Sequence, residues 1–159
     1  MPEELSPNAR KIQDVLAGLG LSCQVVELPA STRTAQEAAQ AIGCRVEQIV
    51  KSLVFQGRET NRPILVMTGG GNCVNETRLA ALSGEPVQKA DADFVRAKTG
   101  YAIGGVPPVG HVETPVTFID EDLLAHGEIW AAAGTPNAVF KLTPADLRRI
   151  TGGRVAGIK

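Results

Sequence analysis

Apolar residues recur along the chain with two different spacings. Near the start they follow one face of a helix: Ile12, Val15, Leu16 and Leu19. Ser6 and Pro7 come before this run as a cap and first-turn pair, and Gly20 follows it. The pattern therefore predicts a helix between Pro7 and Gly20.

Further helices are expected where a polar cap opens an amphipathic run and a glycine closes it. These segments are residues 34–43, 75–84, 91–100 and 143–152. The first begins with Thr34-Ala35-Gln36-Glu37, which has the spacing of a capping box. Single helical turns are expected at residues 45–50 and 121–125.

Short apolar runs bounded by turn residues predict strands. They are residues 23–28, 51–55, 64–68, 101–103, 116–119, 129–133, 138–142 and 155–158. Several of the connections are too short for parallel crossovers, which favours antiparallel pairing. We therefore expect an α/β (α+β) fold with a mixed, mostly antiparallel sheet and surrounding helices, as a single domain over residues 1–159.

The composition is that of a globular protein, and it disfavours some classes of binding partner. The 159 residues are 43% hydrophobic and 21% charged, with a net charge of −1. Because aromatic residues make up only 4%, the core must be aliphatic, and a base-stacking surface for single-stranded nucleic acid is disfavoured. Without a broad basic field, no DNA partner is expected. A local excess of +4 in residues 138–159 fits a solvated helix face as well as a phosphate contact.

The cysteines and histidines give no sign of a disulfide framework or a metal site. Cys23, Cys44 and Cys73 are widely spaced, without a C-x-x-C pair, so they predict reduced thiols in a cytoplasmic protein. No run is long and apolar enough to span a membrane, and no leader pattern precedes the first helix. We expect no metal, no cofactor and no membrane partner.

The most unusual run is Gly104-Gly105-Val106-Pro107-Pro108-Val109-Gly110-His111. Glycines free the backbone, while prolines fix their own φ and lack an N–H. Such a loop can present amides to a carbonyl or phosphate oxygen. The alternative is a rigid turn, which such clusters mark first. Gly69-Gly70-Gly71 lacks both nucleotide-binding signatures, so a tight turn is favoured there.

Lys51 is the best candidate for a functional charge. It is flanked by Val50 and by the apolar residues 53–55, so its ammonium group could enter a cleft and bind a carboxylate, a phosphate or a developing oxyanion. The alternative is a strand-end lysine that extends to water. Covalent catalysis has no good candidate, because there is no G-x-S-x-G motif and no histidine is tied to Cys73.

Four segments together resemble one family. They are residues 34–39, 49–55, 104–111 and 134–140, in that order. The chain resembles the YbaK/ProX family, which comprises free-standing relatives of the editing domain of bacterial prolyl-tRNA synthetases. The resemblance runs from about Ser6 to about Thr151, and its most specific parts are the strand with Lys51 and the glycine- and proline-rich run.

This resemblance implies a compact domain around a barrel-like sheet that hydrolyses, in trans, the ester joining a wrong amino acid to tRNA. Lys51 matches the family's functional lysine, which engages the terminal-nucleotide region. Gly104 and Gly105 match a backbone-donor loop that holds the substrate carbonyl. The implied substrate-binding residues are Thr34, Val106, His111, Gly134 and Asn137.

The chemistry is compatible with these residues. An aminoacyl ester is already activated, so orientation, a positioned water and oxyanion stabilisation suffice. The neighbouring ribose hydroxyl of the substrate could position the water. Some family members have a tyrosine near Thr34, and the polar residue at Asn137 varies, so both positions bear on which amino acid is removed. His111 could act directly or could only support its loop.

We therefore expect a trans-acting aminoacyl-tRNA deacylase for misacylated tRNA, with Ala- or Cys-tRNA(Pro) as the substrate. The expected partners are the 3′ aminoacyl end of that tRNA and, as a candidate, prolyl-tRNA synthetase. Two alternatives stay open: a non-catalytic module that binds tRNA or a synthetase, and a small-ligand-binding domain with the editing fold.

Overall fold

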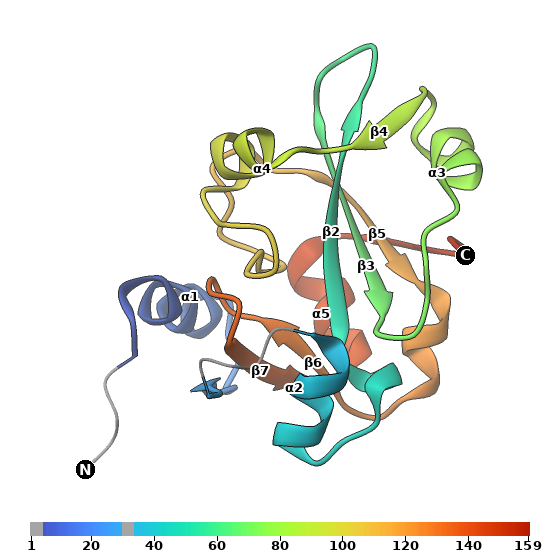
Figure 1. The fold of residues 1–159 in the computed structure, drawn as a ribbon. Helices are drawn as coiled ribbons and strands as arrows, with labels where there is room; N and C mark the ends of the chain where they lie inside the picture. The colour runs from blue at the N-terminus through green and yellow to red at the C-terminus, as the bar shows by residue number, and fades with distance from the viewer. Residues whose placement is uncertain (1–4, 30–33) are drawn as a thin grey trace.

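Two β-sheets that share a hydrophobic core form the centre of the molecule (Figure 1). The computed structural model describes residues 5–29 and 34–159. The larger sheet has the strand order β4-β2-β3-β5-β8. Its strands, in that order, are Val87–Lys89, Val50–Gly57, Pro63–Gly69, Val116–Asp120 and Arg154–Ala156.

The smaller sheet has the order β1-β7-β6 and is antiparallel throughout. Its strands, in that order, are Val25–Glu27, Ala138–Leu142 and Ile129–Ala132. In the larger sheet β2 pairs antiparallel with β3 and β4, whereas the β3–β5 and β5–β8 pairs are parallel. The expected mixed, mostly antiparallel arrangement is confirmed. The sheets are linked by the bridge between Ile49 and Trp130 and do not close into a barrel.

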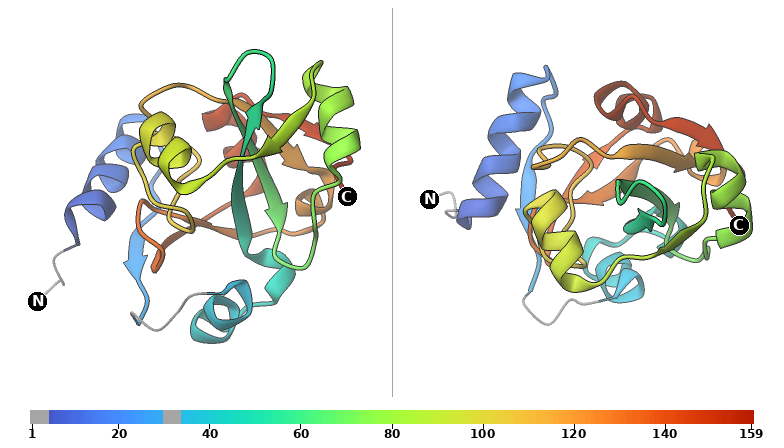
Figure 2. Two further views of the ribbon diagram at one scale, coloured as in Figure 1. Left: turned by 45° about the horizontal axis from the view of Figure 1, so that its top comes forward. Right: turned by 90° about the horizontal axis from the view of Figure 1, so that it is seen from above.

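The helices lie around the sheets on several sides, as the two further views make clear (Figure 2). Helix α1 packs beside β1, and α3 packs beside β4. Their bounds are α1 Pro7–Gly18, α2 Ala35–Ile42, α3 Glu76–Ser83, α4 Ala92–Thr99 and α5 Pro144–Thr151, with 3₁₀ turns η1 Val46–Gln48 and η2 Glu121–Ala125. None of the helices in the described part of the chain is both long enough and apolar enough to cross a lipid bilayer.

Most helix ends are those that the sequence predicts. The side chains of Thr34, Asn75, Asp91 and Thr143 cap the starts of α2 to α5, and each of these helices ends at a glycine in the left-handed region. Helix α1 is the exception. The Ser6 hydroxyl makes no capping bond, and the Ser6 amide instead donates to the Glu27 carboxylate at 2.6 Å.

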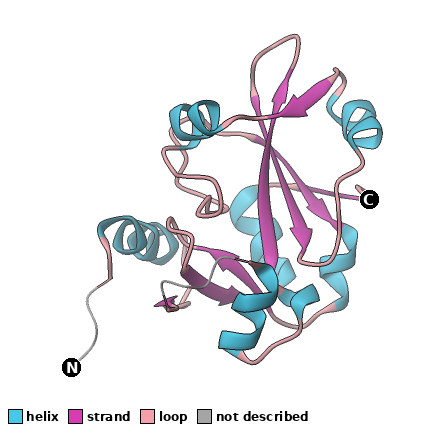
Figure 3. Cartoon of the chain, in the orientation of Figure 1, coloured by secondary structure: helices cyan, strands magenta, loops and turns pink. Residues whose placement is uncertain are grey.

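The strand expected at residues 101–103 is wrong, because this segment is a turn (Figure 3). The Gly105 amide donates to the Ala102 carbonyl at 3.0 Å, which closes the turn. The Tyr101 ring is buried, and its hydroxyl donates to the Gly110 carbonyl at 3.0 Å. The apolar residues here anchor a loop and do not pair with a strand. Strand β4 was not expected, since Val87 is the only apolar side chain among its three residues.

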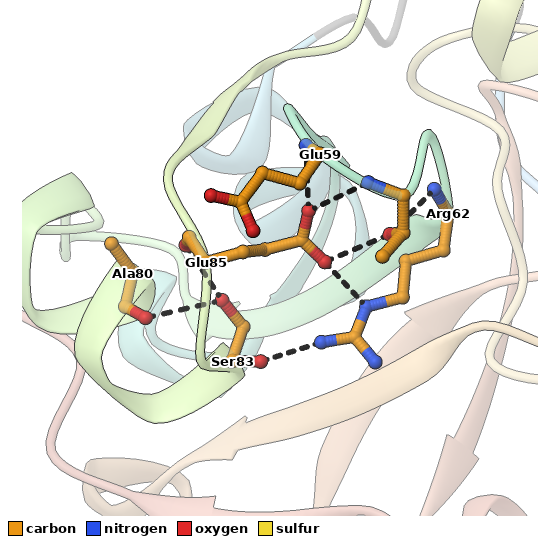
Figure 4. Close-up of polar contacts among 6 residues, drawn as sticks. Glu59, Arg62, Ala80, Ser83 and Glu85 are labelled. Atoms are coloured by element: carbon orange, nitrogen blue, oxygen red, sulfur yellow. Dashed lines mark hydrogen bonds and ion pairs between the residues drawn. The ribbon is translucent and has the colours of Figure 1, made fainter.

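A buried carboxylate fixes the β2–β3 turn to the segment after α3 (Figure 4). Glu85 accepts hydrogen bonds from the amides of Glu59 and Thr60 and from the Thr60 hydroxyl, at 2.8 to 3.0 Å. Arg62 pairs with it at 3.0 Å and donates to the Ser83 carbonyl. Burial by itself would raise the pKa of the Glu85 carboxyl, but the hydrogen bonds from Thr60 and Glu59 and the charge of Arg62 outweigh it, so this pKa is lowered.

This lowered pKa predicts an acid-dependent contribution to stability. The contribution of Glu85 is present above its unfolded pKa of about 4.3 and is lost as the pH falls through its lower folded pKa. Glu85→Gln should lower the urea midpoint at pH 7 and flatten the dependence of the unfolding free energy on pH below about 5. Urea titrations from pH 3 to 7 measure this. A variant as stable and as pH-dependent as the original chain would contradict it.

Candidate functional site

A cavity of about 310 Å³ lies where the two sheets meet, and we call it the inter-sheet cavity. It is lined by the start of α2, by β2 and the residue before it, by the turn at 103–104, and by residues of β6, β7 and the turn between them. The lining residues are Thr34, Ala35, Ala38, Ile49, Val50, Lys51, Ser52, Leu53, Ile103, Gly104, Trp130, Ala132, Pro136 and Val139. The structure thus brings three of the predicted site residues, Thr34, Lys51 and Gly104, to one cavity.

Lys51 is the second residue of β2 and lines the inter-sheet cavity. Its side chain is half-buried, and its backbone lies opposite Thr68 in β3. The ammonium Nζ donates to the backbone carbonyl of Asn72 at 2.6 Å. Lys51 also lines an open depression of about 640 Å³ beside the cavity, together with Thr34 and Gly70. Its positive charge therefore stands at the boundary between an apolar cavity and an open surface.

The two predicted backbone donors differ in the structure. Gly104 is exposed, has a φ of +89° and lines the cavity, and no described group accepts a hydrogen bond from its amide. The Gly105 amide donates to Ala102, and the Gly105 carbonyl accepts from the Gly134 amide at 3.0 Å. Gly104 is therefore the one of the pair with an amide available to a ligand. Gly105 joins two loops.

Close backbone contact explains why position 105 is glycine. A Cβ there would lie 2.8 Å from the carbonyl carbon of Thr135 and 3.0 Å from the nitrogen of Pro136. Gly134 has a φ of +94°, and a Cβ on it would lie 3.0 Å from the Asn8 carbonyl oxygen. The turn at 134–137 therefore stands directly against the turn at 104–105, and Pro136 brings it to the cavity wall.

Asn137 and Val106 support the cavity from outside. The side-chain Nδ2 of Asn137 donates to the Leu28 carbonyl at 2.8 Å, and its side-chain Oδ1 accepts from the Thr135 hydroxyl at 3.2 Å. These bonds hold the turn against the end of β1. Val106 is buried and lines a second cavity of about 270 Å³, which shares Ser52, Leu53 and Ile103 with the inter-sheet cavity. Neither Asn137 nor Val106 lines the inter-sheet cavity itself.

His111 lies apart from Lys51. It lines a separate cavity of about 270 Å³ between α1, α5 and the residue 108–117 segment. Its Nε2 contacts the Pro107 carbonyl oxygen at 2.5 Å, as a donor in the fitting tautomer. Burial, with the nearby charge of Lys11, lowers the pKa of the imidazole, although the bond to Pro107 acts in the opposite direction. At neutral pH this ring is uncharged and supports its loop, and the structure does not bring it to the inter-sheet cavity.

Several lining residues were not predicted from the sequence. Ile103 is 58% exposed at the boundary of the two neighbouring cavities, and Trp130 and Ala132 enter from β6. Ile103 had one signal, an apolar residue placed directly before two glycines. Trp130 and Ala132 had none, because the sequence does not say that the smaller sheet meets β2.

The arrangement combines one cation, one available amide and mainly apolar walls. A cation and an amide can hold a phosphate or a carbonyl oxygen that gains negative charge, while apolar walls accept a small side chain. Within residues 5–29 and 34–159, no group of three or more His, Cys, Asp or Glu side chains is placed to bind a metal ion.

Fold and site together define a class: a small mixed α/β domain with a lysine and a glycine-rich turn at a cavity between two sheets. Residues 29–150 match the sequence profile of the aminoacyl-tRNA editing domain. The chain belongs to this family, and the resemblance to prolyl-tRNA editing domains is confirmed. That residues 1–159 form one such domain stays a prediction.

Individual proteins are also similar to this chain in sequence or in structure. A crystal structure of a protein proposed as a trans-editing enzyme for prolyl-tRNA synthetase is 50% identical, with a TM-score of 0.93 over 98% of this chain and 99% of the other. The uncharacterised protein YwhH of Bacillus subtilis is 30% identical over 82% of this chain and 83% of its own. EbsC of Enterococcus faecalis, proposed as a Cys-tRNA(Pro)/Cys-tRNA(Cys) deacylase, is 28% identical over 79% and 76%.

The contact between the two turns predicts the effect of adding one methyl group. Gly105→Ala should cost roughly 1–3 kcal/mol of unfolding free energy, because the new Cβ overlaps the backbone of Thr135. Gly127→Ala is the matched control, since a Cβ at Gly127 has no atom within 4 Å among the described residues. Urea unfolding of both variants measures the difference. Equal stability of the two would contradict the packing described here.

Proposed function

We propose that this protein is a trans-acting aminoacyl-tRNA deacylase that hydrolyses the ester of misacylated tRNA, with Ala- or Cys-tRNA(Pro) as the substrate. The observation that carries the proposal is the inter-sheet cavity, which Lys51 and Gly104 both line and whose walls are mainly apolar. Membership of the editing-domain family supports it, as do relatives proposed as a trans-editing enzyme and a Cys-tRNA deacylase.

The proposed roles follow from where negative charge develops. Attack of water on the ester carbonyl places negative charge on its oxygen, and the Gly104 amide donates to that oxygen. Lys51 engages the terminal nucleotide from the edge of the open depression and adds a positive charge near the reacting centre. The adjacent ribose hydroxyl of the substrate positions the water. The ester bond breaks, and the amino acid and the tRNA hydroxyl leave.

The cavity walls favour a small amino acid. Ala35, Ala38 and Ala132 give the walls short side chains, while Trp130 and Pro136 limit the width. Affinity alone discriminates weakly, because one methylene is worth only about 1–3 kcal/mol. Steric exclusion of a larger side chain is therefore the more effective filter, as in the second sieve of editing enzymes.

The proposed partners are the 3′ end of the misacylated tRNA and prolyl-tRNA synthetase. The relative proposed as a trans-editing enzyme for that synthetase supports the second partner. A net charge of −1 gives the chain no overall positive field to hold tRNA by itself. Delivery by a synthetase would supply the missing affinity, and it would place the protein in the cytoplasm where tRNA is charged.

Replacement of Lys51 separates a deacylase from a non-catalytic binding module. Lys51→Ala should reduce the single-turnover hydrolysis rate of Ala- or Cys-tRNA(Pro) by about 10²–10³, since it removes one electrostatic contact to the transition state. Affinity for uncharged tRNA should fall much less than this rate, because the terminal nucleotide is only one part of the bound tRNA. Lys98→Ala is the control. Lys98 lies on α4 and is also partly buried, but it pairs with Glu113 at 3.0 Å and lines neither the inter-sheet cavity nor the open depression. Full activity of Lys51→Ala would contradict the assigned role, and a wild-type chain without hydrolysis would favour the binding module.

A further inference from the structure

The loop that contains Gly69-Gly70-Gly71 lies next to Lys51, because Gly70 and Lys51 line the same open depression. It ends at Asn72, whose backbone carbonyl accepts the 2.6 Å hydrogen bond from the Lys51 ammonium. We propose that Asn72 is a positioning residue, whose side chain fixes this loop so that its carbonyl holds Lys51 in one orientation. The effect on reaction rate rests on the function proposed above, whereas the effect on the Lys51 side chain does not.

The Asn72 side chain is tied to two carboxylates. Its Nδ2 donates to Asp120 Oδ2 at 2.7 Å and to Asp122 Oδ2 at 3.0 Å. Asp120 is only 1% exposed, and the same Oδ2 accepts from the Gly69 amide at 3.2 Å. The backbone N–H of Asn72 in turn donates to the Gly69 carbonyl at 2.9 Å. Both ends of the glycine loop therefore converge on one buried carboxylate oxygen.

The second carboxylate is held in its charged form. Lys159 pairs with Asp122 Oδ2 at 2.7 Å. Hydrogen bonds from Lys159 and then from Asn72 lower the pKa of the Asp122 carboxyl. Asp122 is thus ionised at neutral pH, and its carboxylate accepts a hydrogen bond from the Asn72 side chain.

The opposite side of the loop is closed by backbone contact. A Cβ on Gly70 would overlap the carbonyl oxygen of Val46 and would lie 3.1 Å from the Ala35 Cβ. A Cβ on Gly69 would lie 3.3 Å from the Glu47 carbonyl oxygen. Glycines therefore let the loop pass between η1 and Asp120. The loop is held by contact on one side and by Asn72 on the other.

This arrangement has a consequence for the cation. A lysine side chain has four rotatable bonds and loses considerable freedom when a ligand fixes it. The Asn72 carbonyl uses one of the three ammonium hydrogens and leaves two for a substrate. Lys51 is then oriented before the reaction begins, so less ordering is needed to reach the transition state.

Asn72→Ala tests this role with two readouts on the full chain. The first is the ¹⁵N relaxation order parameter of the Lys51 ammonium group, which should fall to the value of an exposed lysine such as Lys89. The second is deacylation of misacylated tRNA, where kcat should fall by about ten- to a hundredfold while KM stays within about twofold. Asn72→Asp, equal in size but without the donor, should give the same two changes.

Asn75→Ala is the matched control. Asn75 lies three residues further on and caps α3 by accepting from the Arg78 amide at 3.1 Å, so its loss costs stability without releasing the glycine loop. This variant should retain both the Lys51 order parameter and the kcat. An unchanged Lys51 order parameter in both Asn72 variants would overturn the proposal. If the wild-type chain has no deacylase activity, the proposed function fails, and the order parameter still decides the role of Asn72.

Discussion

The site depends on the place where the two sheets touch, the bridge between Ile49 and Trp130. Directly after this bridge the chain enters β2, so residues 49–53 line the cavity, while β2 pairs with β3 along its length and with β4 near its end. Without this contact, β6 and β7 would supply no opposite wall. Lys51 would then be an ordinary strand-end lysine with its ammonium in water.

A second constraint is the backbone contact between the turns at 104–105 and 134–136. The bond from the Gly134 amide to the Gly105 carbonyl fixes their spacing, and the missing Cβ at Gly105 permits it. As a result Gly104, at the left-handed φ that glycine tolerates, keeps its amide free at the cavity. The unusual run of glycines and prolines therefore builds one wall by packing and presents one donor, where the sequence suggested two.

Local signals in the sequence predicted most of the elements because their causes are local. Caps such as Thr34 and Asn75 act within one helical turn, and β3, which is buried throughout, is apolar from Pro63 to Met67. Residues 101–103 were misread, since buried loop anchors such as Tyr101 have the same composition as a short strand. The parallel pairing of β3 with β5 joins segments far apart in the chain, and no local pattern encodes it.

For the site, the sequence identified Lys51 and Gly104 through their unusual local context. It also suggested His111, which shares the glycine-rich run but lies in another cavity because the loop turns away towards α1 and α5. Asn72 was passed over, since its role needs Asp120, which is distant in sequence and close in space. Residues that act through tertiary contacts are the ones that a single sequence conceals.

A deacylation panel tests the proposed activity most directly. The purified chain is incubated separately with Ala-, Cys-, Ser- and Pro-charged tRNA(Pro), and the initial rates of ester hydrolysis are compared with the rates without protein. We expect accelerated hydrolysis of Ala- or Cys-tRNA(Pro), with Pro-tRNA(Pro) left intact. No acceleration with any of the four, or equal acceleration with Pro-tRNA(Pro), would contradict it.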